Sequence, residues 1–242
     1  MTNPVFNQKL MQRDTSLASE PMTINGAINK TFFLLLVLVT ASFGVWNLFL
    51  RGYTDKAMML MGVGFLISII AFLVIIFTRK AMNIWTPVYA VGEGLILGGI
   101  SVIFEKSYPG IAIQAIGATF MTLGSMLFLY RIGAIKCTEK FRSVIFIGTL
   151  SIAGIYLINM LGSLFGMQIP QIFGSSNFGI LFSLIVVAFA SLNLIIDFDF
   201  IERGAQNMLA KEYEWYGAFG LMVTLVWLYL EILNLLAKLR DR

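Results

Sequence analysis

The amino-acid sequence predicts an all-α, polytopic membrane protein with seven transmembrane helices. The first observation is the composition: of 242 residues, 58% are hydrophobic and only 12% are charged, and the mean hydropathy is +0.85. A soluble domain is nearer to half apolar and a quarter charged, so this chain has too few charges to cover a soluble globule. The second observation is a series of apolar stretches, each near the roughly 20 residues that cross a bilayer.

Seven such stretches follow one another along the chain. The run over 143–196 contains 54 uncharged residues, which is too many for one helix, and the Gly, Pro and Ser residues of 166–177 divide it in two. Glu93 interrupts the third stretch and Glu231 interrupts the last. The predicted spans are 31–50, 57–78, 81–104, 107–130, 143–165, 178–201 and 215–238.

The predicted organisation is a flexible cytoplasmic N-terminal tail over 1–24, followed by a seven-helix transmembrane domain over 25–242. Seven spans put the two ends of the chain on opposite sides of the membrane. Of the 17 Lys and Arg residues, 11 fall on the side of the N-terminus, which predicts a cytoplasmic N-terminus. The basic residues are spread over short loops, so the net charge of +4 does not indicate nucleic-acid binding.

Four carboxylates lie inside the predicted spans, and no Lys or Arg is expected inside the same stretches. A buried carboxylate without a basic partner must take up a proton, hold a cation or face water. Acids at membrane depth are therefore functional candidates, and they indicate a protein that moves or senses cations. Because the chain has no histidine, a pH response must come from carboxylates. The four are Glu93, Asp197, Asp199 and Glu231.

Asp197 and Asp199 have different expected roles. Two residues apart on a helix means about 200° of rotation, so the two acids cannot share a face. Asp199 precedes Arg203 by four residues, a spacing that favours an ion pair. Asp197 follows Asn193 by four residues on a polar stripe, which makes it the leading functional candidate, with a structural hydrogen bond as the alternative.

Glu231 also lies on a polar stripe, with Asn234 three residues after it. The alternative is an ion pair with Lys238, but a separation of seven residues is long for such a pair. Glu93 is followed by small residues at Gly94 and Gly98, a pattern that lets helices pack closely. Its alternative role is to hydrogen-bond within such a packed interface.

Three stretches of the chain resemble the transmembrane BAX inhibitor motif family, in its bacterial YccA-like branch. They are EGLILGGIS in the third span, IDFDFIERG at the end of the sixth and LYLEILNLLAKL in the seventh. The resemblance implies seven spans with the last helix central, and a location in the inner (plasma) membrane of the cell. It also implies a pH-sensitive calcium leak, and eukaryotic relatives are implicated in suppressing cell death.

The resemblance further implies that an acid near the end of span six and an acid in span seven form the pH sensor. The matching positions are Asp197 and Glu231. Ile196 replaces the family's tyrosine, Asp199 stands where glutamine is common, and Glu231 replaces the commoner aspartate.

A family arginine can bind the span-six acid in the closed state, and Arg79 and Arg203 are the positional candidates. Counting from the ends of the spans, Asp197 and Glu231 would differ in depth by about 10 Å. Glu93 lies at a depth that suits Asp197 better. The expected site is therefore Asp197 with Glu93, Asp197 with Glu231, or all three.

These observations predict a pH-sensitive calcium or cation leak channel, gated by protonation of the intramembrane carboxylates. Asp197 and Glu231 are candidate calcium ligands because calcium prefers carboxylate oxygens. No phosphate loop, nucleophile–base pair or zinc-protease signature is present, so neither an enzyme nor a cofactor is expected. The alternative function is a non-transporting membrane regulator that binds a membrane protease or another membrane complex.

Overall fold

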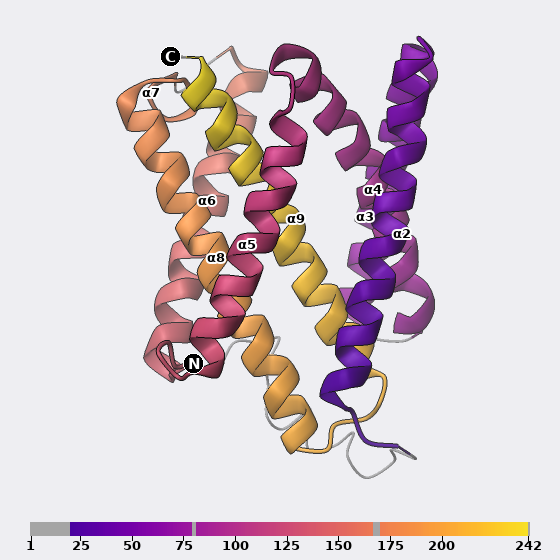
Figure 1. Ribbon diagram of the computed structural model, residues 1–242, viewed down its shortest axis with the longest axis vertical. Coiled ribbons are helices and arrows are strands. Elements are labelled where there is room, and N and C mark those ends of the chain that lie inside the picture. The colour runs from indigo at the N-terminus through magenta and orange to yellow at the C-terminus, as the bar shows by residue number, and fades with distance from the viewer. Residues whose placement is uncertain (1–19, 79–80, 167–169, 242) are drawn as a thin grey trace. The chain divides into compact units, whose positions relative to one another are not determined.

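The computed structural model describes residues 20–78, 81–166 and 170–241, and this part of the chain is helical without a strand (Figure 1). Seven of its helices are long and apolar enough to cross a membrane, which confirms the predicted fold class. A four-residue helix, α7 (Pro170–Phe173), lies between the fifth and the sixth of these long helices. The long helices are α2 (Ile24–Leu50), α3 (Thr54–Thr78), α4 (Met82–Ser107), α5 (Ile111–Arg131), α6 (Glu139–Leu164), α8 (Asn177–Gln206) and α9 (Tyr213–Arg240).

The helix ends show where hydropathy alone misplaced a boundary. The predicted break over 166–177 is confirmed, because α6 ends at Leu164 and α8 begins at Asn177. By contrast, α8 continues through Arg203 and α9 continues through Lys238 to Arg240, so both helices extend past their apolar stretches and include basic residues. A charged side chain ends an apolar run without ending the helix, because the backbone hydrogen bonds continue past it.

The structure divides into two compact units. The first runs to Val102 and includes Asp199–Met222, and the second comprises Ile103–Phe198 and Val223–Arg242. Helices α4, α8 and α9 contribute residues to both units. Within α9, 61% of the most apolar stretch is buried, the largest share of any long helix in the described chain. The central position of the last helix stays a prediction.

In the first unit, α4 packs closely against α2 through its small residues, as the stripe after Glu93 predicts. A methyl group at Gly94 would lie 2.4 Å from the carbonyl oxygen of Leu38, and one at Gly98 would lie 2.4 Å from that of Ser42. The Ser42 hydroxyl donates a hydrogen bond to the Gly94 carbonyl at 2.9 Å. Only glycine permits this approach, because the neighbouring atoms belong to the backbone.

Gly98→Ala should therefore destabilise the protein. The added methyl group meets the carbonyl oxygen and the Cα atom of Ser42, which cannot rotate away. Overpacking of this kind costs about 1–3 kcal/mol. Thermal unfolding in detergent measures the effect, and Gly117→Ala is the matched control because no atom lies within 4 Å of a methyl group built there. Equal melting temperatures for the two variants would contradict the packing argument.

In the second unit, the C-terminal end of α9 is bound to the connection between α4 and α5. The Arg240 guanidinium donates to the Pro109 carbonyl at 2.9 Å and to the Gln114 side chain at 3.1 Å. The Tyr108 hydroxyl donates to the carboxylate of Asp241. These contacts hold the end of the last helix in a defined position within its unit.

Candidate functional site

Asp197 lies on α8 in the second unit, where its carboxyl contacts the Thr224 hydroxyl of α9. The residue as a whole is half-buried, but its Oδ2 atom is fully enclosed and has no hydrogen-bond partner among the described residues. A buried carboxyl oxygen without a donor is costly. Among the four acids, Asp197 is therefore the one whose buried carboxyl oxygen would be stabilised most by a proton or a bound cation.

Glu231 is buried on α9 in the same unit, with only 5% of its surface exposed. The Tyr156 hydroxyl of α6 lies 2.8 and 2.9 Å from the two carboxyl oxygens, and Trp227 Nε1 donates to one of them at 3.1 Å. Among the described ion pairs, none joins Glu231 to Lys238. Neutral donors thus hold this acid in place.

The contacts show that Asp197 and Glu231 lie at different positions along the axis of α9. Asp197 lies beside Thr224, and Glu231 follows Thr224 by seven residues, which is about 10 Å along a helix. The two acids therefore stand two helical turns apart along the last helix, and different residues contact each of them.

The secondary candidates have separate contacts. Arg203 Nε pairs with Asp199 Oδ2 at 2.9 Å, which confirms the predicted spacing. Asn193 donates to Thr149 Oγ1 of α6 at 2.9 Å and to a carbonyl of its own helix at 2.8 Å. Asn234 is half-buried on α9, and Arg79 lies outside the described residues.

Glu93 lies half-buried on α4 in the first unit. The Tyr89 hydroxyl, one turn earlier on the same helix, faces its carboxyl. Ser68 of α3 faces the same carboxyl, but its buried hydroxyl has no hydrogen bond of good geometry within the described chain. The pairing of Glu93 with Asp197 stays a prediction.

The predicted calcium ligation by Asp197 and Glu231 also stays a prediction. Within residues 20–78, 81–166 and 170–241, no three His, Cys, Asp or Glu side chains gather as a metal site. A calcium ion needs six to eight oxygens, so two carboxylates alone would not complete its shell. Carbonyl, hydroxyl or water oxygens would have to supply the rest.

A further buried acid, Glu214 at the start of α9, was missed in the sequence. Its carboxylate pairs with Lys30 of α2 and accepts bonds from the backbone amide and the hydroxyl of Thr23, both at 2.9 Å. The Thr23 hydroxyl also accepts from the Gly26 amide and so caps α2. The Lys30 ammonium lies 5.3 Å from the centre of the Trp215 ring.

No local spacing predicts the Lys30–Glu214 pair, because 184 residues separate its members. The available signal was one Lys at the start of the first apolar stretch and one Glu at the start of the last. Glycine at position 26 also fits this contact, since a methyl group there would lie 2.2 Å from a Glu214 oxygen. An open groove of about 720 Å³ beside this network gives water access to Lys30.

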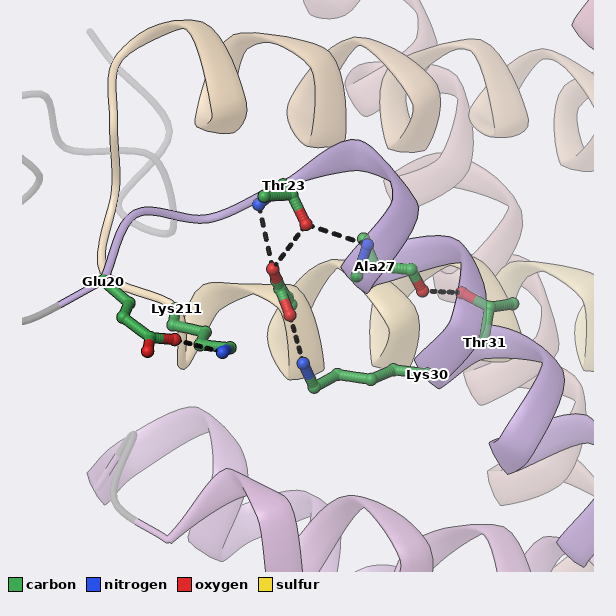
Figure 2. A network of polar contacts seen from close by, with 8 residues as sticks. Glu20, Thr23, Ala27, Lys30, Thr31 and Lys211 are labelled. Atoms are coloured by element: carbon green, nitrogen blue, oxygen red, sulfur yellow. Dashed lines mark hydrogen bonds and ion pairs between the residues drawn. The ribbon is translucent and has the colours of Figure 1, made fainter.

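Residues 20–23, which we call the strap, connect this network to the loop between α8 and α9. Pro21 and Ala210 form an isolated bridge, and the Met22 amide donates to the Leu209 carbonyl at 2.7 Å. Glu20 and Lys211 form an exposed ion pair (Figure 2). Within the predicted tail, residues 1–19 lie outside the described residues, and the strap is bonded to the loop.

Acidification should loosen the strap. The hydrogen bond and positive charge of Lys211 hold the pKa of Glu20 below its usual 4.5, so the pair's contribution is present above pH 4.5 and is lost as pH falls further. Glu20 in turn raises the pKa of Lys211, so that side chain keeps its contribution up to pH 10.5 and loses it only above that value. The hydrogen-exchange protection factor of the Met22 amide should fall below pH 4.5. In Lys211→Met this fall should be absent, and an unchanged fall would contradict the assignment.

Comparison with known families agrees with the seven apolar helices. A family model described as Bax inhibitor 1 like matches residues 3–241. The chain belongs to the Bax inhibitor 1-like family. A comparison with curated proteins found no match.

Membership in the Bax inhibitor 1-like family makes the chain a member of a membrane-protein family, which agrees with its seven apolar helices and a place in the lipid bilayer. The family is not known as a family of enzymes. The match confirms the resemblance stated from the sequence, and assignment to the YccA-like branch is consistent with it.

Proposed function

We propose that the chain is a pH-sensitive leak pathway for calcium or a related cation, gated by protonation of Asp197 and Glu231. We place it in the inner membrane with its N-terminus in the cytoplasm, on the distribution of Lys and Arg. The Bax inhibitor 1-like family is often linked to calcium leak, which supports the assignment to ion transport.

The observation that carries the proposal is the unpartnered Oδ2 atom of Asp197. A carboxylate in a low-dielectric interior needs a positive charge or a proton. Its fellow acid Glu231 is held by Tyr156 and Trp227, which are neutral donors and leave its charge uncompensated by direct contact. Protons and cations therefore compete for the same two acids, and this competition is the physical basis of a pH-dependent leak.

The separation along α9 favours two acids acting in sequence over one shared pair. Asp197 of α8 lies beside Thr224 of α9. Glu231 lies about 10 Å from Thr224 along α9. A cation would then move between two carboxylates, each neutralised by its own proton at low pH. Thr224 and Tyr156 would supply oxygen contacts at the two levels.

The purified protein tests this proposal in liposomes loaded with a calcium dye. We expect calcium entry above that of protein-free liposomes without any added partner, and a rate that changes with pH. Liposomes containing an unrelated seven-helix protein control for leakage at protein–lipid boundaries. Entry equal to that control at every pH would refute the leak function.

A second function, regulation of a membrane protease or another membrane complex, is favoured by one observation. The bond between Tyr156 and Glu231 joins α6 to α9, which is what a purely structural acid would do. A regulator would be silent in the liposome experiment and would act only when its membrane partner is reconstituted with it.

A further inference from the structure

Lys238 is a buried cation that the proposed function does not use. It lies on α9 near the C-terminus, within the second unit, and only 5% of its surface is exposed. Its ammonium donates to Ser183 Oγ at 2.8 Å, to the Ile172 carbonyl at 3.2 Å and to the Gly179 carbonyl at 3.3 Å. No carboxylate is among these three contacts, which we call the oxygen cage.

The number of acceptors matches a charged ammonium. An ammonium carries three N–H donors, and each of the three cage oxygens can accept one. A neutral amine has only two donors and could serve only two of the three oxygens. The cage thus surrounds a positive charge with neutral oxygens, which is how proteins also bind hard cations.

Local backbone geometry brings the cage oxygens together. The oxygens come from α7 (Ile172) and from the first two turns of α8 (Gly179 and Ser183). A methyl group at Gly179 would lie 2.1 Å from the Gly174 carbonyl oxygen and 3.0 Å from that of Ile172. Because Gly179 has no side chain, the backbone of Ile172 and Gly174 can pack against the start of α8, and the Ile172 and Gly179 carbonyl oxygens reach the same ammonium.

We propose that the Lys238 ammonium is a tethered cation that fills a monovalent-cation site formed by Ile172, Gly179 and Ser183. The side chain keeps the site permanently occupied, so no free ion is needed to satisfy its oxygens. When the side chain is removed, the oxygen cage accepts a small free ammonium ion.

The tethered charge also acts on the cation pathway, and this part rests on the proposed function. Lys238 follows Glu231 by seven residues on α9, a rise of about 10 Å. At an effective dielectric constant of about 20, a positive charge at that distance weakens cation binding about tenfold for each unit of ion charge. Lys238 therefore lowers the occupancy of Glu231 by calcium more than by monovalent ions.

Chemical rescue tests the site itself. Lys238→Ala should lower Tm, and n-propylammonium, which replaces the missing atoms, should restore at least half of the loss. Tetramethylammonium, which has no N–H donor, and neutral n-propanol should restore none of it. Lys238→Met fills the space without a charge and should respond equally to all three additives. Recovery of Lys238→Ala with n-propanol, or no recovery with n-propylammonium, would overturn the proposal.

A double-mutant cycle keeps the proposal testable if Lys238→Ala does not fold. Lys238→Met and Ser183→Ala remove the two ends of the shortest bond in the cage. If that bond forms, the loss of Tm in the double variant is smaller than the sum of the two single losses. Additive losses would show that the two side chains do not interact and would overturn the cage.

Flux measurements then separate this inference from the proposed function. In liposomes, Lys238→Met should increase calcium flux relative to potassium flux by about tenfold, because the charge near Glu231 is gone. An unchanged ratio of calcium to potassium flux would overturn the proposed effect of Lys238 on the pathway. It would not affect the conclusion from the rescue experiment. The absence of any flux in the wild type would instead refute the leak, and the rescue experiment would still decide the cation site.

Discussion

Asp197→Asn and Glu231→Gln should each flatten the pH dependence of calcium flux and reduce the flux at neutral pH by at least about tenfold. Each substitution keeps the size of the side chain and removes the group that exchanges a proton for a cation. Asp197 should show the larger effect, because its Oδ2 atom has no donor in the described structure. At Glu231 the donors Tyr156 and Trp227 remain and can still bond to the Gln carbonyl oxygen.

Asp199→Asn is the matched control for these variants. It removes an acid from the same helix only two residues away, but Asp199 is paired with Arg203 at 2.9 Å. The Asp199→Asn variant should show the same pH dependence of calcium flux as the wild type. The measurement is dye-detected calcium entry into liposomes across a pH series. If Asp197→Asn and Glu231→Gln both kept the wild-type profile, protonation of these acids would not gate the flux.

Lys30→Met should cause the largest loss of stability among the variants considered. It leaves the Glu214 carboxylate, whose side chain is 2% exposed, without its cation. Breaking a buried ion pair by removing one partner costs about 3–5 kcal/mol, which lowers Tm by roughly 10 °C in a protein of this size. The contact of the Lys30 ammonium with the Trp215 ring is lost as well. Thermal unfolding in detergent at neutral pH measures the loss.

Two further variants show whether the unpaired charge of Glu214 causes the loss of stability in Lys30→Met. Lys211→Met removes the cation of the exposed pair with Glu20 and should change Tm little, because solvent screens that pair. The double variant Lys30→Met with Glu214→Gln should regain much of the lost Tm, since no uncompensated charge stays buried. A double variant as unstable as Lys30→Met alone would mean that lost packing, and not the unpaired carboxylate, destabilises the protein.

Local patterns in the sequence predicted those contacts that depend on neighbours along one helix. The four-residue spacing of Asp199 and Arg203 predicted their ion pair, because residues so spaced share a helix face. The small residues Gly94 and Gly98 predicted close packing of α4, which the distances to Leu38 and Ser42 confirm.

The sequence alone could not predict contacts between segments that lie far apart along the chain. Tyr156 and Glu231 are separated by 75 residues, and Thr23 and Glu214 by 191. An apolar stretch predicts that a helix crosses the membrane but not which face it turns toward its neighbours. The same limit explains Lys238, which was placed at the end of a span and is in fact buried among backbone carbonyl oxygens.

By itself, the sequence determined the seven helices and the acids that they carry into the membrane. These follow from hydrophobic length and from the high cost of burying charge, which are properties of single segments. Only the tertiary structure decided the surroundings of each acid: Thr224 beside Asp197, Tyr156 beside Glu231 and Lys30 beside Glu214. The physical reason is that a hydrogen bond or ion pair depends on a few ångströms of separation, which helix packing sets and hydropathy does not encode.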